Sequence, residues 1–342
     1  MAKAERKAST LRVALLGAET LLGREIVEVL KSRSKSVEVE NFSANGEGNF
    51  GEEQGEAIYI EPLGAKALEG DAAIIVAGTA AGAQKTYELV KAAGGRPSII
   101  DCTGYLENEP EARIIAPPLE EPSEKRWLSV VAHPAAAALS AVLQRLAGYR
   151  PIRQSVAHVF EPASERGKAG ISELHSQTTN LLSFKSLDKA VFDAQVGFNM
   201  LAAYGDDAPT QLASVEQRIE RDTATILART SASRNVSMPS VRVLQAPVFH
   251  GYSISLWIQF EGTIEATQLA EALASAHIEV RGPGEEAPTA VGAASQSGLV
   301  AGDIRVDPNN PQAAWLWIVG DNLRLVADVA ADLVSALTRS VE

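Results

Sequence analysis

The sequence predicts an α/β protein with a doubly wound, Rossmann-like nucleotide-binding domain followed by a second, α+β domain. Three observations predict this fold class. The chain has 342 residues, which is enough for two domains with separate cores. It begins with a strand, a glycine turn and a helix, and strands and helices then alternate up to about residue 146. Beyond Arg150 the pattern changes to long strands beside a few helices.

The composition is that of an ordinary globular protein, with 46% hydrophobic and 22% charged residues. No apolar run approaches the roughly 20 residues that cross a bilayer, so a membrane protein is not expected. The net charge of −12 argues against nucleic acid as a partner, because phosphate backbones need clustered cations. Residues 1–10 form a polar tail without the apolar centre of a signal peptide. Together with the single cysteine, Cys102, this predicts a cytoplasmic protein without an intrachain disulfide.

The first strand is predicted over residues 11–16, a short apolar run that ends at Gly17. From Thr20 the apolar residues fall on one face of a helix. The residues on this face are Leu21, Leu22, Ile26, Val29 and Leu30. A buried strand, a tight glycine turn and a helix form the first unit of a doubly wound nucleotide-binding domain.

The turn from Gly17 to Gly23 is a relative of the dinucleotide-binding glycine fingerprint, with its middle glycine replaced. Gly17 would allow the sharp turn, Gly23 would let the helix lie close to the strand, and the free N–H groups at the helix start would hold a pyrophosphate. A structural turn that binds nothing is the alternative. The residues that we expect to contact a dinucleotide are Gly17, Thr20, Leu21, Leu22, Gly78 and Asn322.

The second strand, predicted over residues 37–42, bears on the choice of dinucleotide, because its end meets the adenosine ribose. No Lys or Arg lies between Ser36 and Ala65, whereas Glu38, Glu40 and Glu47 are present. A ribose 2′-phosphate would therefore find little support. We expect weak dinucleotide binding, with NAD bound at least as well as NADP.

The remaining elements are predicted in chain order. In the first domain we expect strands at 71–78, 98–102 and 128–132, a helix at 80–94, and an alanine-rich helix after His133 to about 146. In the second we expect strands at 156–160, 240–246, 250–260, 302–306 and 314–319, and helices after Gly167 and at 215–227. The second sheet should be largely antiparallel, and a last helix at 322–337 should pack on the first domain. The expected boundaries are 11–132 with 325–342 for the nucleotide-binding domain, and 133–324 for the dimerisation and substrate domain.

Six spaced segments resemble the aspartate-β-semialdehyde dehydrogenase family, and more closely its divergent Usg-like branch. These segments are residues 17–23, 166–174, 198–200, 245–251, 291–298 and 320–324. The resemblance implies a homodimer and a reaction of amino-acid biosynthesis, in which NADPH reduces an acyl phosphate to an aldehyde. It also implies a cysteine thiolate, in an Asn-Pro-Asn-Cys motif at a helix start, which attacks the acyl carbon to form a thioester.

The chemical positions of the family are replaced here. The motif reads His133-Pro134-Ala135-Ala136, so that Ala136 matches the cysteine. Tyr252 matches the general-base histidine, and Gln245 matches the arginine that binds the substrate carboxylate. Leu106 matches a phosphate-binding arginine.

Only Glu216 and Arg218 keep the family's charged character, and they remain candidates for substrate binding. Cys102 is a weak substitute nucleophile, because a cysteine at the end of an apolar strand is usually a buried small hydrophobe. His133 could serve as a base and Tyr252 as an acid, although a tyrosine in a strand more often serves packing. We expect no metal site.

Three functions compete. The first is a homodimeric pseudoenzyme that has lost acyl-phosphate chemistry and keeps the scaffold and a nucleotide or small-molecule pocket. The second is an active NAD(P)-dependent aldehyde or semialdehyde oxidoreductase that uses Tyr252 or His133. The third is a structural partner in mixed dimers with an authentic dehydrogenase. A homodimer is also expected from the apolar strands of the second domain, because one face of such a sheet needs a cover.

Overall fold

The structure is a computed structural model that describes residues 11–34, 36–53, 56–64, 68, 72–116, 127–230 and 234–339. The polar tail at 1–10 and Asp71, at the start of a predicted strand, lie outside the described residues. The chain divides into two compact units. The first unit comprises residues 1–117, 121–131 and 326–342, and the second comprises residues 118–120 and 132–325.

The first unit contains a six-stranded sheet in the order β2-β1-β5-β6-β8-β7, in which every pair is parallel. Its strands are β1 (Leu11–Leu16), β2 (Val37–Phe42), β5 (Ala73–Val76), β6 (Ser98–Asp101), β7 (Arg113–Ile115) and β8 (Leu128–Val131). β2 and β5 flank β1 on opposite sides, which is the arrangement of a doubly wound nucleotide-binding fold. The predicted fold class of this part is therefore confirmed.

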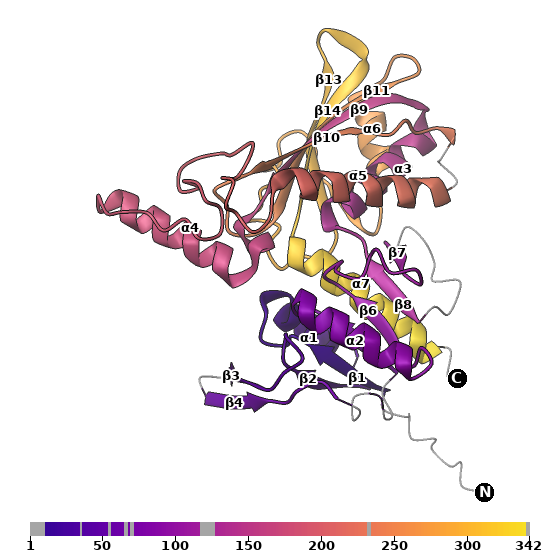
Figure 1. Ribbon diagram of the computed structural model, residues 1–342. Coiled ribbons are helices and arrows are strands. Elements are labelled where there is room, and N and C mark those ends of the chain that lie inside the picture. Colours follow the sequence, from indigo (N-terminus) through magenta and orange to yellow (C-terminus); the bar gives the residue numbers. More distant parts are fainter. Residues whose placement is uncertain are drawn as a thin grey trace, which may run out of the picture. The chain divides into compact units, whose positions relative to one another are not determined.

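Helices cover both faces of this sheet, as its continuous apolar strands require. Val13 and Leu15 of β1 pack with α1 (Leu21–Arg33) and with α7 (Asn322–Arg339). Ala14 and Leu16 point to the other face and pack with α2 (Ala80–Ala92). Residues of α7 from Val326 onward share this core, so this part of the last helix belongs to the first unit (Figure 1).

The sequence analysis did not anticipate an antiparallel hairpin that follows β2. It consists of β3 (Asn49–Glu53) and β4 (Glu56–Ile60). Phe50 and Tyr59 are exposed and pair edge to face, with ring centroids 5.4 Å apart. The short strand β7 was also missed, because three residues give no readable periodicity.

The second unit contains a mixed sheet in the order β10-β9-β11-β14-β13-β12. Its strands are β9 (Ile152–Glu161), β10 (Ser240–Gln245), β11 (Tyr252–Phe260), β12 (Ile278–Val280), β13 (Leu299–Asp307) and β14 (Asn310–Gly320). The four central strands are antiparallel as predicted. Each of the two outermost strands runs parallel to its neighbour, β10 to β9 and β12 to β13. The sheet is therefore not antiparallel throughout.

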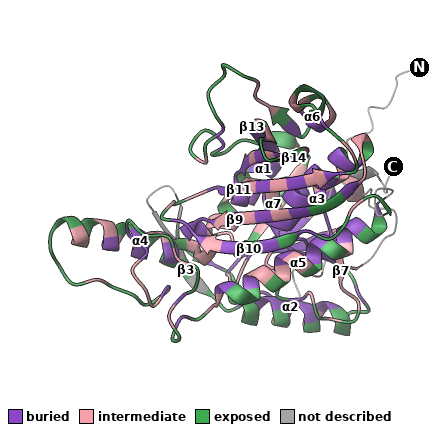
Figure 2. Ribbon diagram, turned by 90° about the horizontal axis from the view of Figure 1, so that it is seen from above, coloured by how far each residue is buried: buried purple, intermediate pink, exposed green. Residues whose placement is uncertain are grey.

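Three helices cover one face of this sheet: α3 (Pro134–Tyr149), α5 (Leu212–Arg229) and α6 (Ala266–Leu273). The remaining helix of the unit, α4 (Gly167–Leu182), follows a short 3-10 helix at Ala163–Arg166. Along the strands of this sheet, successive side chains point alternately into this core and to the opposite, half-buried face. We call this opposite face the open face. Trp257, Trp315 and Trp317 belong to the open face. In Figure 2, β10, β9 and β11 lie side by side in front of α3, and buried and half-buried residues alternate along β11 and along most of β9.

None of the helices in the described residues is long and apolar enough to cross a membrane.

Candidate functional site

His133 caps the helix at which the sequence analysis placed the family nucleophile. Its ring Nδ1 accepts a hydrogen bond from the backbone N–H of Ala135 at 3.3 Å, and Pro134 occupies the first helical position, where no N–H is needed. The backbone N–H of His133 donates to Oδ2 of Asp222 on α5 at 2.8 Å. The start of α3 is therefore fixed at two points.

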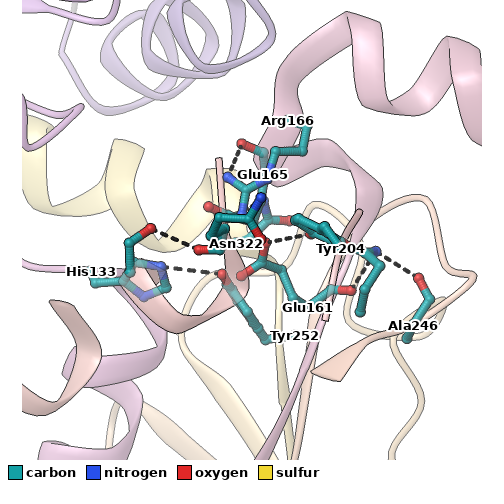
Figure 3. Close-up of polar contacts among 11 residues, drawn as sticks. His133, Glu161, Glu165, Arg166, Tyr204, Ala246, Tyr252 and Asn322 are labelled. Atoms are coloured by element: carbon teal, nitrogen blue, oxygen red, sulfur yellow. Dashed lines mark hydrogen bonds and ion pairs between the residues drawn. The ribbon is translucent and has the colours of Figure 1, made fainter. Parts of the chain in front are cut away.

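Tyr252, the first residue of β11, meets the other side of the His133 ring. The Tyr252 hydroxyl lies 3.4 Å from His133 Nε2, and the two rings pack edge to face (Figure 3). Because Nδ1 accepts the Ala135 N–H, neutral His133 carries its hydrogen on Nε2 and donates it to the Tyr252 oxygen. The structure thus brings together the two candidates for proton transfer.

Burial sets the protonation of this pair. It lowers the pKa of His133 well below its usual range, and the charges of Arg218 and Arg166 lower it further. It raises the pKa of Tyr252 well above its usual range, and the nearby Glu165 and Glu161 act in the same direction. At neutral pH, the imidazole and the phenol are therefore both uncharged.

Ala136 lies in the first turn of α3 and is completely buried in the core of the second unit. It offers no thiol or hydroxyl at this helix start. Cys102 belongs to the first unit, where it packs with Ile100, Ile115 and Val131. Burial raises the pKa of its thiol well above the usual range, and Asp101 raises it further, so Cys102 is a buried hydrophobe and a poor nucleophile.

Gln245 ends β10 and is completely buried. Its amide NH₂ donates to the backbone carbonyls of Glu161 and Ala246, at 2.9 and 2.8 Å. Its amide oxygen accepts from the Tyr204 hydroxyl at 2.6 Å. The polar atoms of its side chain are therefore engaged within the protein.

A buried ion pair adjoins Gln245. Arg166 Nη2 contacts Glu161 Oε1, and the Tyr204 hydroxyl lies 3.4 Å from the same oxygen. The Glu161 side chain is fully buried and that of Arg166 is 14% exposed. Burial raises the pKa of Glu161 to about 7 although Arg166 opposes this, and Glu161 in turn raises the pKa of Arg166. The guanidinium of this cluster thus has an internal carboxylate as its partner.

Asn322, expected to contact a dinucleotide, is buried in the second unit. Its Oδ1 accepts from the Ser164 hydroxyl and from the Gly251 N–H, each at 3.1 Å, and its Nδ2 donates to Glu165 at 2.7 Å. These bonds join the start of α7 to the loop before β11 and to the 3-10 helix. Asn322 thus orders the surroundings of Tyr252, the next residue after Gly251.

Glu216 and Arg218, the candidates for substrate binding, both lie on α5 but contact different partners. The Glu216 carboxylate accepts from the Val243 N–H at 2.9 Å and so ties α5 to β10. Arg218 lies on another side of the helix, where its Nε is 3.8 Å from Oδ2 of Asp222 and its charge acts on His133. The structure therefore places Arg218, but not Glu216, with the His133 cluster.

In the first unit, the glycine turn between β1 and α1 is well formed. Thr20 caps α1, because its hydroxyl oxygen accepts from the Gly23 N–H at 2.9 Å. The same hydroxyl donates to the carbonyls of Gly17 and Ala77, at 2.8 and 3.0 Å. A Cβ on Gly23 would lie 2.0 Å from the Gly17 carbonyl oxygen, so close packing of helix and strand requires glycine there.

Two of the expected dinucleotide contacts, Leu21 and Leu22, open α1. Among the described residues, nothing accepts their backbone N–H groups. This part of the turn fits a pyrophosphate. Gly78 has a structural role instead, because a Cβ on it would lie 2.2 Å from the carbonyl oxygen of Ala44.

The turn fits a dinucleotide less well on the side where the adenosine ribose would lie. Glu19, inside the turn, accepts the backbone N–H of Ala44, just after β2, at 2.8 Å. The sequence analysis did not single out Glu19, because it considered only the charges between Ser36 and Ala65. It also missed Lys85 of α2, which reaches this loop and is held by Glu47 at 2.7 Å. The acids Glu40 and Glu47 are therefore both ion-paired, Glu40 with Arg12.

Sequence reasoning also missed Glu161, Arg166, Tyr204 and Asp222. Arg166 was visible only as the first letter of a family segment. Glu161 had one local signal, since it stands at an inward position of an alternating strand. Tyr204 lies in a loop without periodicity, so only the tertiary structure could reveal it.

A groove of about 550 Å³ in the second unit lies between α6, β13 and the loop at 281–288. None of the predicted site residues lines it. The described residues contain no cluster of three or more His, Cys, Asp or Glu side chains that could hold a metal ion.

Residues 145–325 match the protein family described as the semialdehyde dehydrogenase dimerisation domain. A USG-1 protein homologue from Pseudomonas aeruginosa is 30% identical over 340 residues, which cover 96% of this chain and 97% of that protein. The structure of a probable aspartate-semialdehyde dehydrogenase from the same organism has a TM-score of 0.81 and 28% identity, over 96% of this chain and 98% of that one. An aspartate-semialdehyde dehydrogenase with NADP from Candida albicans shares the fold, with a TM-score of 0.66 and 14% identity over 97% and 99% of the two chains. This chain therefore belongs to the aspartate-semialdehyde dehydrogenase family, as its sequence segments predicted.

Proposed function

We propose that this chain is a homodimeric pseudoenzyme of the family, which has lost acyl-phosphate reduction and keeps a binding or regulatory role. One observation carries the proposal. Ala136, fully buried in the first turn of α3, stands where the family places its cysteine. Thioester formation needs a thiolate with a depressed pKa at an accessible position, and an alanine methyl group provides none.

The other positions support the same conclusion. Cys102 is buried, and burial raises its thiol pKa, so it is not a replacement nucleophile. Gln245 carries no charge for a substrate carboxylate, and Arg166 is engaged with Glu161. An acidic substrate would have to displace this internal carboxylate from a buried guanidinium, which opposes binding.

The dinucleotide part of the proposal rests on the α1 turn. The Candida albicans relative has NADP in its structure. In this chain Gly17, Thr20, Leu21 and Leu22 keep the turn and the open N–H groups for a pyrophosphate. When bound, a nicotinamide dinucleotide would supply hydride chemistry. We expect weak binding, with NAD bound at least as well as NADP.

The homodimer would form through the second unit. The match to a dimerisation domain covers residues 145–325 of this unit, and the open face presents Trp257, Trp315 and Trp317 half-buried in the single chain. Covering this face with a second copy would use a closed two-fold interface. The single buried cysteine, Cys102, suits the cytoplasm as the setting of this dimer.

A second candidate function is an active NAD(P)-dependent aldehyde oxidoreductase without a thioester. The contact of 3.4 Å between Tyr252 and His133 favours it. Since His133 Nε2–H donates to the tyrosine oxygen, the phenol hydrogen remains for a carbonyl oxygen, and Tyr252 would act as the proton donor. In this case Tyr252→Phe abolishes aldehyde reduction, whereas the pseudoenzyme shows no reduction to abolish.

The test is an assay of purified protein with aspartate semialdehyde, phosphate and NADP, beside an authentic family enzyme. We expect no turnover above background, because loss of a catalytic nucleophile costs several orders of magnitude in rate. Turnover within about tenfold of an ordinary dehydrogenase would overturn the proposal. A Cys102→Ser variant is the control, since loss of such turnover in it would identify Cys102 as the nucleophile.

A further inference from the structure

Glu19 places a carboxylate between two backbone segments of the first unit. It belongs to the turn after β1, and its Oε1 accepts the N–H of Ala44, in the loop after β2, at 2.8 Å. The side chain is partly buried in this position. The negative charge therefore lies at the carboxyl end of β1 and β2, and not on the outer surface of α1.

The Ala44 end of this contact is held firmly. The Ala44 carbonyl accepts from the Thr79 N–H at 2.8 Å and from the Thr79 hydroxyl at 3.2 Å. Two residues further on, the Gly46 carbonyl accepts from Lys85 Nζ at 2.8 Å, and the Gly46 N–H donates to Ser43 at 2.9 Å. The loop thus has bonds to α2 and to itself, which fix the Ala44 N–H that Glu19 uses.

This location coincides with the ribose end of a dinucleotide site. In a doubly wound fold the pyrophosphate lies at the turn after the first strand, and the adenosine ribose lies at the end of the second. Glu19 spans these two segments. A carboxylate there accepts hydrogen bonds from ribose hydroxyls, whereas it repels a 2′-phosphate with its charge of roughly −1.5 to −2.

The cation that reaches this loop, Lys85, has an acidic partner of its own. Lys85 is 2.7 Å from Glu47 Oε1. A 2′-phosphate would therefore meet the Glu19 carboxylate and would have to compete with Glu47 for Lys85.

We propose that Glu19 determines the nucleotide specificity of this chain. It excludes ligands with a ribose 2′-phosphate and admits adenosine dinucleotides with a free 2′-hydroxyl. This inference rests on the nucleotide-binding part of the proposed function. It assigns the selectivity to one side chain in the glycine turn, and not to the acids that follow β2.

Isothermal titration of the full chain with NAD and with NADP tests the inference. The wild type should bind NAD more tightly than NADP, by about tenfold or more. Glu19→Gln keeps the size of the side chain and an acceptor for the Ala44 N–H but removes the charge. It should tighten NADP binding by about tenfold and leave NAD binding within roughly threefold.

Two matched variants complete the design. Glu19→Asp keeps the charge and should keep the preference for NAD. Glu28→Gln makes the same chemical change on the exposed side of α1, and should leave both affinities unchanged. Binding of both dinucleotides with a ratio that Glu19→Gln leaves unchanged would overturn this inference alone. Binding of neither ligand by any variant would overturn it together with the nucleotide-binding part of the proposed function.

Discussion

His133 and Tyr252, 119 positions apart in the sequence, lie with Nε2 and the hydroxyl oxygen 3.4 Å apart in the buried interior of the second unit. Both are uncharged at neutral pH, because burial shifts their pKa values in opposite directions. The sequence analysis predicts that they match an asparagine and a histidine of the family and that Ala136 matches its nucleophile. The pair thus adjoins a helix start that carries no thiol.

The protonation of His133 gives the first prediction. Its folded-state pKa is lowered, so below about pH 6.5 the unfolded chain binds a proton that the native chain does not. This group therefore contributes stability above pH 6.5 that is lost as the pH falls, at up to about 1.4 kcal/mol per pH unit. His133→Asn keeps a helix cap and should remove this part of the pH dependence, as measured by urea unfolding from pH 7.5 to 5.5. An unchanged profile would show that His133 is protonated in the folded state.

Glu161 should make the stability depend on pH in the opposite direction from His133. Its folded-state pKa is about 7, above the roughly 4.3 of an unfolded glutamate, so the stability that it contributes below pH 4.3 is lost as the pH rises to 7. Relative to wild type, Glu161→Gln should gain up to about 3 kcal/mol between pH 4.5 and 8. Glu271→Gln on the exposed side of α6 is the control and should show no such gain. A relative loss for Glu161→Gln would mean that the contact with Arg166 outweighs burial.

An arginine at position 245, where the sequence analysis predicts the family's carboxylate-binding arginine, should destabilise the fold. Gln245→Arg removes the acceptor of the Tyr204 hydroxyl and adds a second cation, at a fully buried position, beside Arg166. A buried unpaired charge costs about 3 kcal/mol or more, which corresponds to a melting temperature lower by about 6 °C or more. Gln154→Arg, at an exposed position of β9, should change the melting temperature by less than about 2 °C. Equal melting temperatures for the two variants would contradict this prediction.

The open face should form the dimer interface. Light scattering at micromolar concentration should give twice the chain mass of 36.2 kDa, with an interface of at least about 2,000 Å². Ser255 is half-buried in the middle of this face, beside Trp317 and His158 on the neighbouring strands. Ser255→Arg should therefore produce a folded monomer, as checked by circular dichroism. Ala224→Arg, on the exposed side of α5, should remain a dimer. A wild-type mass of 36.2 kDa, unchanged on concentration, would mean that the face is covered within one chain.

Much of the fold could be predicted from the sequence, because its signals are local. Residues 11–16 and the apolar face from Leu21 to Leu30 specify β1 and α1 without any distant contact. The alternation of residue types along β9 and β11 likewise indicates which side chains are buried. The β3–β4 hairpin escaped prediction, since the mostly polar sequence of β3 carries no clear period of two.

The sequence by itself determined the family, the alternation of strands and helices, and the absence of a cysteine at Ala136, because these depend on residue identity and on spacing along the chain. Only the tertiary structure decided which distant polar groups meet. It placed Tyr252 against His133, brought Lys85 to the loop after β2, and fixed Glu19 on Ala44. The physical reason is that Coulomb interactions and hydrogen bonds depend on distance in space, and segments far apart in the chain come within 4 Å only after the sheets have formed.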